Sequence, residues 1–408
     1  MSNYKVPEKT VRDMIALVEE QGYFDKPDSY ILWDWIVSHR VLVVSESETA
    51  DFSKVLMEKF DEQLSELIRD ADQRYSLIVH HLLYVTCDTV DIAQEVRSEL
   101  YGGNYHGHVY NIKIADKDDI EFDRIFREEL LDMKFGLVVG NPPYNGDVYI
   151  DFVMKGHEMA SKYSLWITPA KWGSRDNAKE LRNTIKSHLM NVVYYISCYD
   201  IFNITAWGGV TYYLIDKNNK YDNFRLINKC AKYKAFNGDT IESVNKDYYS
   251  FNIFGESIVK KLGDYHILSG RYDSSDKYFV HVNNTVSMAV MIFSSGGSVS
   301  VLPNVYVDTD KEFHKNIMIL YSSNDEDKCK SCKSYLSTKF IRFLLLVGVN
   351  IQNPFTKTID SETNKMSLRY VPMPDAFDHI FTDAELYKKY NLTNEEINVI
   401  ESVIKELK

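Results

Sequence analysis

Apolar and polar residues alternate in blocks along the first half of the chain, and these blocks predict strands and helices in turn. Short apolar runs rich in β-branched residues predict strands, and longer stretches with apolar residues three or four positions apart predict amphipathic helices. The strands are expected at residues 40–44, 78–85, 109–114, 137–140, 164–168, 191–197 and 210–215, and the helices at 6–18, 52–70, 90–100 and 148–160. Strands that alternate with helices predict an α/β fold with a doubly wound sheet, in which ligands bind at the carboxyl ends of parallel strands.

The pattern changes near residue 217, where lysines become interleaved with aromatic residues. Later runs at 278–282, 287–293 and 298–307 predict strands, residues 340–347 predict a helix, and Thr382 and Thr393 each precede a further helix. Glu396 stands three residues after Thr393, which is the spacing of a capping box. We therefore predict two domains, residues 1–218 and residues 219–408, of which the second is β-rich or α+β.

One predicted strand ends in residues with a specific chemical use, Asn141-Pro142-Pro143-Tyr144. Two consecutive prolines fix their own backbone angles and remove two donors, so the carbonyls of Asn141 and Pro142 are free to face a ligand. The Asn141 amide adds an acceptor and Tyr144 adds an aromatic face. This set could hold an exocyclic amino group, as methylation of a base taken out of the helical stack requires. The alternative is a strand-ending turn without a ligand.

The tetrad resembles the catalytic N-P-P-Y motif of amino-methylating DNA methyltransferases, specifically the N6-adenine enzymes of restriction-modification and phage origin with the gamma-type motif order. The resemblance implies a Rossmann-like class I fold and transfer of a methyl group from S-adenosylmethionine to a flipped-out adenine at a specific DNA site. It implies catalytic roles for Asn141, Pro142, Pro143 and Tyr144, with Asn141 also near the cofactor. Phe202 matches the aromatic that packs on the flipped adenine opposite Tyr144, although a core phenylalanine is the alternative.

The cofactor half of the resemblance is weaker. Pro7 opens a predicted helix where relatives have Thr-Pro, with Val6 in place of the threonine. After the strand at 40–44, the expected cofactor loop falls on Ser45, Glu48, Ala50 and Phe52, and the two glycines that relatives use fall on Glu48 and Ala50. A non-glycine residue at positive φ costs about 1–2 kcal/mol. The alternative function is therefore a weakened or inactive methyltransferase-fold protein that acts as a DNA-binding or partner subunit.

Two aspartates complete the expected cofactor site. Asp88 follows the second strand, where the resemblance implies a contact with the ribose hydroxyls, and Asp116 follows the third, where it implies a contact with the adenine amino group. The alternatives are an Asx cap of the helix at 90–100 for Asp88 and a solvent-facing loop residue for Asp116.

DNA contacts are expected in the basic and aromatic region after residue 217. Such a mixture suits a strand or hairpin along phosphates, whereas a solvated linker would have fewer aromatic residues. The expected contact residues are Lys220, Arg225, Lys229, Lys232 and Arg271. The tail, with a V-P-x-P segment from Val371, resembles methylase-like proteins of restriction systems and phages. Double-stranded DNA is the expected partner, and the resemblance allows a separate restriction endonuclease that acts on the same site.

Composition adds limits. The 408 residues are 45% apolar and 26% charged, which is ordinary for a globular protein, and the net charge of −12 argues against a uniformly basic nucleic-acid surface. We find no apolar run of membrane-spanning length and no basic-then-apolar leader, so we expect a cytoplasmic protein of a bacterial or phage-infected bacterial cell. Cys329 and Cys332 form one C-x-x-C, for which we favour a solvated loop over a zinc site, and we expect no metal.

Overall fold

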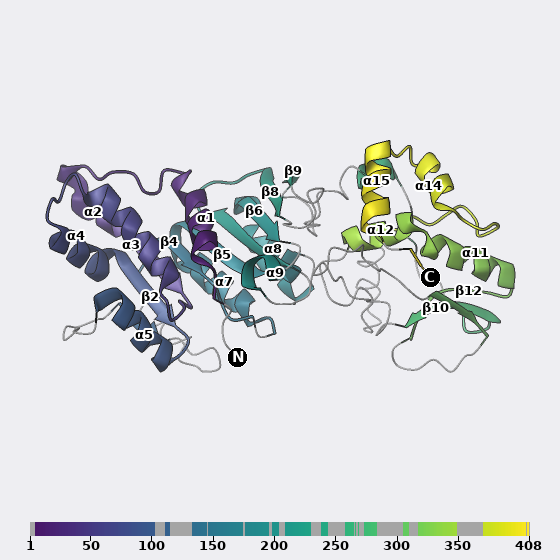
Figure 1. Cartoon of the computed structure of the whole chain (residues 1–408), viewed down its shortest axis with the longest axis horizontal. Helices are drawn as coiled ribbons and strands as arrows, with labels where there is room; N and C mark the ends of the chain where they lie inside the picture. The colour runs from purple at the N-terminus through teal and green to yellow at the C-terminus, as the bar shows by residue number, and fades with distance from the viewer. Residues whose placement is uncertain are drawn as a thin grey trace.

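The computed structural model describes the chain in segments, and its elements form a nine-stranded sheet with flanking helices and a three-stranded sheet with its own helices (Figure 1). The described residues are 5–102, 111–114, 133–144, 146–173, 176–195, 198–203, 209–229, 238–243, 258–264, 266, 268, 273–283, 305–309, 317–348, 370–404 and 406–407.

The large sheet has the strand order β3-β2-β1-β4-β5-β7-β6-β8-β9. Its strands are β1 (Val41–Val44), β2 (Leu83–Cys87), β3 (Ile112–Ile114), β4 (Phe135–Gly140), β5 (Ala160–Pro169), β6 (Leu189–Tyr195), β7 (Val210–Asp216), β8 (Asn223–Lys229) and β9 (Gly238–Ser243). The pairs from β3 through β5 are all parallel, as is β6 with β8, while β7 runs antiparallel between β5 and β6. The predicted doubly wound α/β fold is confirmed.

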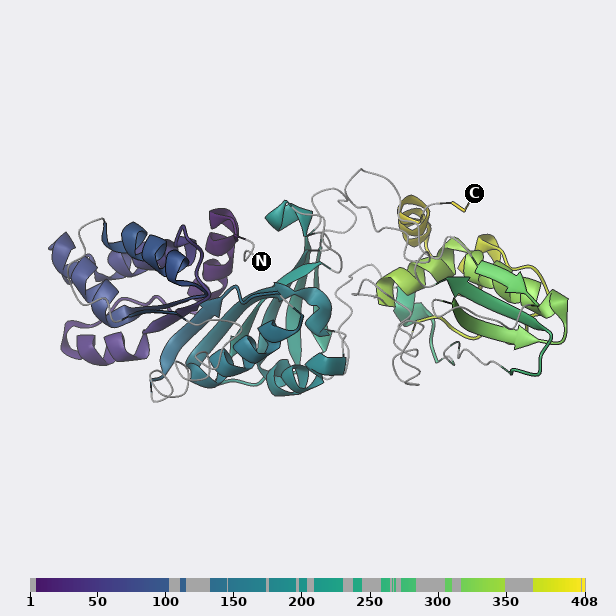
Figure 2. The same ribbon diagram turned by 90° about the horizontal axis from the view of Figure 1, so that it is seen from below.

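Both faces of this sheet are buried, which explains why its strands are continuous apolar runs. Within β1, Leu42 and Val44 belong to one buried cluster and Val41 and Val43 belong to the other. The first face is covered by α7 (Val148–Met159) and α8 (Lys179–Ile185), and the second by α1 (Glu8–Glu19), α2 (Leu32–Ser38), α3 (Asp51–Leu64), α5 (Val90–Tyr101) and α9 (Tyr199–Phe202). Helices are seen on the two faces in Figure 2.

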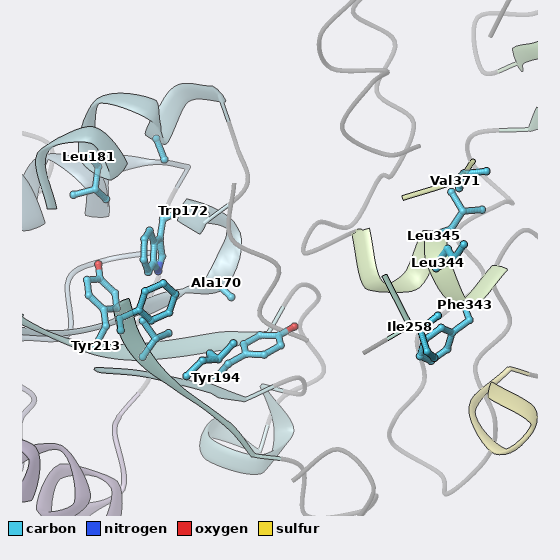
Figure 3. Close-up of a cluster of buried hydrophobic side chains, with 14 of the residues drawn as sticks. Ala170, Trp172, Leu181, Tyr194, Tyr213, Ile258, Phe343, Leu344, Leu345 and Val371 are labelled. Carbon is cyan, nitrogen blue, oxygen red and sulfur yellow. The ribbon is translucent and has the colours of Figure 1, made fainter. Parts of the chain in front are cut away.

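The first face includes the fully buried Trp172 and Tyr213, whose ring centroids are 4.6 Å apart (Figure 3). Trp172 donates from its indole N–H to the Thr211 hydroxyl at 2.9 Å. Trp172 therefore belongs to the core.

The three-stranded sheet is antiparallel, in the order β11-β10-β12. Its strands are β10 (Tyr278–Asn283), β11 (Val305–Asp308) and β12 (Ile317–Ser323), and helix α11 (Glu326–Ser337) packs on it. Helices α12 (Lys339–Gly348), α14 (Asp383–Lys389) and α15 (Asn394–Val403) follow, and Phe343, Leu344 and Leu345 of α12 are buried near Ile258 and Val371 (Figure 3). Thr382 and Thr393 cap α14 and α15, and the capping box of Thr393 with Glu396 is confirmed.

Three local expectations are corrected by the structure. Strands β8 and β9 pair with the large sheet, so the sheet continues past residue 218 to Ser243. Residues Ile78–Leu82, expected as part of a strand, continue the helical turn of α4 (Ala71–Leu77), because a short apolar run does not distinguish a buried helix from a strand. Cys329 and Cys332 lie on the buried face of α11, beside Tyr335 and Leu336, and not in a solvated loop.

Candidate active site

The strand order places the carboxyl ends of β1 and β4 side by side. At this point the direction in which successive strands are added to the sheet reverses. The chain runs from β1 outward to β2 and β3, and then returns to β4 on the other side of β1. In sheets of this kind ligands bind outside the carboxyl ends of the strands at such a switch point. The loop that begins at Ser45 and the tetrad that begins at Asn141 therefore meet at one edge, as the Asn141 N–H donates to the Val44 carbonyl at 3.3 Å.

The tetrad is buried at its start and has no regular secondary structure, as its prolines predict. Asn141 is 5% exposed, and Pro142 and Pro143 are buried. The approach of β4 to β1 depends on Gly140, since a Cβ there would lie 2.5 Å from the Val44 carbonyl oxygen. A small residue before the tetrad therefore lets Asn141 sit directly beside the end of β1.

The two aromatic residues expected to bind the base are neighbours in the structure. The Tyr144 and Phe202 ring centroids are 6.0 Å apart with an interplanar angle of 71°, an edge-to-face contact. The Tyr144 hydroxyl donates to the Ile167 carbonyl at 3.3 Å, and burial raises the pKa of Tyr144 well above its usual range. Phe202 is partly buried against the core cluster, so it contacts Tyr144 and the core at once. Stacking of a base on these rings stays a prediction.

The loop after β1 keeps backbone angles that glycine favours although it contains none. Ser45 has φ of 56° and Ala50 has φ of 52°, both in the left-handed region. Both residues are buried, and Ala50 is part of the apolar core on the α3 side. Phe52 is also buried in that core, whereas Glu48, the predicted cofactor contact, is exposed. Glu48 therefore does not point into the buried interior of the loop, and the cofactor contacts of this loop stay a prediction.

A different acid, Glu46, occupies the interior of this loop. It is 1% exposed and accepts hydrogen bonds from the Ser47 N–H at 2.9 Å and from the Ser53 N–H and hydroxyl, each at 2.8 Å. Ser53 lies in the first turn of α3, where unpaired N–H groups and the helix dipole favour a negative charge. Burial nevertheless raises the pKa of Glu46 to about 6. Nothing in the sequence distinguished Glu46 from Glu48.

Asp88 lies at the next strand end, with 9% of its surface exposed. The cap of α5 is Thr89, whose hydroxyl accepts from the Ile92 N–H, so the alternative role of Asp88 as that cap is wrong. The pKa of the Cys87 thiol is raised by burial and further by the nearby charges of Glu46 and Asp88. Two carboxylates from neighbouring strand ends therefore lie near the same buried thiol.

The N-terminal segment lies beside the same loop. Pro7 precedes α1 and its carbonyl accepts from the Val11 N–H at 3.1 Å. The Lys5 ammonium lies 3.5 Å from the carboxylate of Asp51, the first residue of α3. This ion pair joins the segment before α1 to the start of α3, and a cofactor contact by Pro7 stays a prediction.

The basic residues are divided between the two ends of the sheet. Arg225 and Lys229 lie on the exposed face of β8, and Lys229 is in register with Tyr195 at the carboxyl end of the parallel strand β6. Lys220 precedes β8 and so lies toward the opposite end of the sheet from the tetrad. Asp116, Lys232 and Arg271 lie outside the described residues.

Within the described segments no group of three or more His, Cys, Asp or Glu side chains could hold a metal ion, and no helix there is long and apolar enough to cross a membrane.

Comparison with known sequences gives one relevant similarity. The chain is 30% identical over 124 residues to an uncharacterized adenine-specific methylase of Mycoplasma pneumoniae, a match that covers 26% of this chain and 29% of that protein. The chain is similar to an adenine-specific methylase. The match spans less than a third of that relative's length, and no family profile matches the chain. The resemblance predicted from the tetrad is therefore confirmed, while the activity of the whole chain is a matter for proposal.

Solved structures of restriction-modification proteins also align with the chain. The methyltransferase subunit of a type I system from Streptococcus thermophilus covers 55% of this chain and 47% of its own length at 14% identity, with a TM-score of 0.37. The type IIG restriction endonuclease BpuSI covers 98% of this chain and 66% of its own length at 9% identity, with a TM-score of 0.40.

Proposed function

We propose that the chain is a site-specific DNA methyltransferase that transfers a methyl group from S-adenosylmethionine to the amino nitrogen of a flipped-out adenine. The observation that carries the proposal is the position of the Asn141–Tyr144 tetrad. It combines buried acceptors and an aromatic ring at the switch point of the sheet, directly beside the end of β1. This is where a base and a cofactor bound to neighbouring strand ends would meet.

The proposed chemistry needs acceptors more than a nucleophilic side chain. An adenine amino nitrogen is a weak nucleophile because its lone pair is delocalised into the ring. The Asn141 amide oxygen and the Pro142 carbonyl would accept its two hydrogens and favour the tetrahedral geometry of attack, an interaction that is strongest in the transition state. Tyr144, fixed by its bond to the Ile167 carbonyl, would stack on the base and hold it in place.

The loop after β1 fits the cofactor in its backbone. The Ala50 side chain lies in the buried core, so the methyl group that replaces the expected glycine does not fill the space beyond the loop. Ser45 keeps the turn at positive φ. Glu46 and Asp88 are the carboxylates that would face the positive and hydroxyl groups of the cofactor, in place of the exposed Glu48. S-adenosylmethionine, when bound, would supply the methyl group. Glu46 already accepts from the Ser53 N–H and hydroxyl, so a contact with the cofactor would add to these hydrogen bonds or replace them.

A second candidate function rests on that same loop. Ser45 and Ala50 are held at positive φ, at a cost of about 1–2 kcal/mol each. The Glu46 carboxylate already accepts the Ser53 N–H in the first turn of α3. A chain that had lost cofactor binding would keep the fold and serve as a DNA-binding or partner subunit. Under either function we infer that double-stranded DNA is the partner, and that Arg225 and Lys229 of β8 contact its phosphates. A restriction endonuclease that acts on the same site is a further candidate partner.

The deciding experiment is a methyl-transfer assay on mixed-sequence DNA with labelled cofactor. We expect transfer by the unmodified chain and almost none by Asn141→Ala, while Asn394→Ala, which changes an exposed asparagine on α15, retains full activity. Full methylation by the Asn141→Ala variant would sink the assignment. Calorimetric titration with S-adenosylmethionine, with and without DNA, separates the two functions, because absence of heat in both titrations supports the non-catalytic subunit.

A further inference from the structure

The loop that follows the tetrad is held by a residue of the neighbouring strand end. The Lys171 ammonium donates to the Gly146 carbonyl and lies 2.9 Å from the Asp147 carboxylate. It also lies over the Tyr149 ring, 5.3 Å from the centroid. The opposite side of the Asp147 carboxylate accepts from the Asn177 amide. Residues 146–149 are thus bound on two sides by the segment after β5.

Lys171 itself projects from a well-anchored turn. The turn, Ala170–Gly173, follows β5, and the Ala170 N–H donates to the Gly209 carbonyl at 3.1 Å. On the other side, Trp172 is fully buried and its carbonyl accepts from Arg182 at 2.8 Å. A lysine on a turn fixed at both ends can hold a neighbouring loop in one position, because only its own side chain is left to move.

The strand before this turn contacts the tetrad itself. The Ile167 carbonyl of β5 accepts from the Tyr144 hydroxyl, and Lys171 stands four residues further along the chain. One contact from β5 and one from the turn that follows it therefore hold Tyr144 on one side and Gly146 and Asp147 on the other.

We propose that Lys171 is a positioning residue that fixes the tetrad for reaction by binding Gly146 and Asp147. This role rests on the proposed function. A direct phosphate contact is the less favourable use of Lys171, because its side chain is only 18% exposed and its ammonium already engages a carbonyl, a carboxylate and an aromatic ring. Misplacement of catalytic groups by about 1 Å can reduce a rate by about 10²-fold.

The test compares Lys171→Met with Lys59→Met. Lys59 makes a similar ion pair with Glu19 at 2.7 Å and is 24% exposed, but it joins α3 to α1 on the other side of the sheet. We expect Lys171→Met to reduce kcat by about 10- to 100-fold with little change in the KM for DNA, and Lys171→Arg to recover part of the loss. Lys59→Met should leave both constants unchanged. A large rise in KM with unchanged kcat would instead show a DNA contact and overturn the proposal.

Hydrogen exchange provides a readout that does not depend on activity. We expect the amides of residues 144 and 146–150 to lose about tenfold or more protection in Lys171→Met, while β4 keeps its protection and Lys59→Met leaves the loop unchanged. Unchanged protection in Lys171→Met would refute the positioning role even in an active enzyme. If the unmodified chain shows no methyl transfer, the proposed function fails, and the exchange comparison still decides whether Lys171 orders the loop.

Discussion

Replacement of Gly140 by alanine tests whether the close approach of β4 to β1 creates the candidate active site. The added Cβ would lie 2.5 Å from the Val44 carbonyl oxygen, 2.8 Å from the Val44 Cβ and 3.2 Å from the Trp166 ring. An ordinary carbon–oxygen contact is about 3.4 Å, so the two strands would have to separate by about 0.9 Å. That movement acts directly on Asn141, whose N–H is bound to the same carbonyl.

The magnitude follows from two terms. Overpacking of a rigid core costs about 1–3 kcal/mol, and weakening of the Asn141 hydrogen bond adds about 1 kcal/mol, so we expect a loss of about 2–4 kcal/mol in the free energy of unfolding. Urea unfolding measures this loss. Below the unfolding transition we also expect a drop in methyl transfer of about 10²-fold, because Asn141 would shift by nearly 1 Å.

Gly156→Ala is the matched control. A Cβ at Gly156 would lie 2.3 Å from the buried Trp166 ring, so this variant is also overpacked, although the gain of alanine over glycine in a helix returns up to about 1 kcal/mol. Gly156 lies on α7, away from the β1 loop. We expect lower stability with nearly normal activity of the folded protein. Equal activity loss in the two variants, or a stability change below about 0.5 kcal/mol in Gly140→Ala, would refute the reasoning.

Three further predictions concern pH and base binding. Burial lowers the pKa of His39 from 6.5 to about 4, so stability should be complete above pH 6.5 and fall by about 3 kcal/mol as pH decreases to 4; urea unfolding of His39→Leu should lack this slope. Burial raises the pKa of Glu46 from 4.5 to about 6, so its contribution is complete below pH 4.5 and falls by about 2 kcal/mol as pH rises to 6; Glu46→Gln should remove that decrease in the same measurement. Phe202→Ala should weaken binding of DNA that contains a flipped base by about 1–3 kcal/mol without loss of cofactor heat, and unchanged DNA affinity would argue against a stacking role.

The order of strands and helices could be predicted because strands that are buried on both faces leave a continuous apolar pattern. β1, β4, β5 and β7 were all recognised from such runs. The pattern was less informative where packing overrides local preference. Residues Ile78–Leu82 are as apolar as a strand but continue a helix, and β8, with its alternating exposed and buried residues, was attributed to a second domain although it pairs with β6.

The site could be predicted where a motif carries the chemistry and not where folding selects one of several similar residues. The tetrad was found from its residue types and Phe202 from the family resemblance, and the structure brings Tyr144 and Phe202 together. Glu46 was missed because Glu46 and Glu48 are equivalent in a loop until the start of α3 draws one carboxylate inward. Lys171 was not singled out because its contacts depend on the end of β5 lying beside the loop after β4, which only the sheet order reveals.

The contact between Tyr144 and Phe202 indicates what must change for a base to bind between these two rings, as we propose. Two rings stacked on opposite faces of a base are separated by about 7 Å and are parallel, whereas these rings are 6.0 Å apart and meet at 71°. One ring must therefore rotate and withdraw. Tyr144 is held by Ile167 through its hydroxyl and by Lys171 through the next residues, while Phe202 ends the four-residue helix α9 and is followed by Asn203 at φ of 53°. The Phe202 N–H also donates to the Cys198 carbonyl at 2.8 Å, so both residues are held and the proposed entry of a base requires rotation of a side chain.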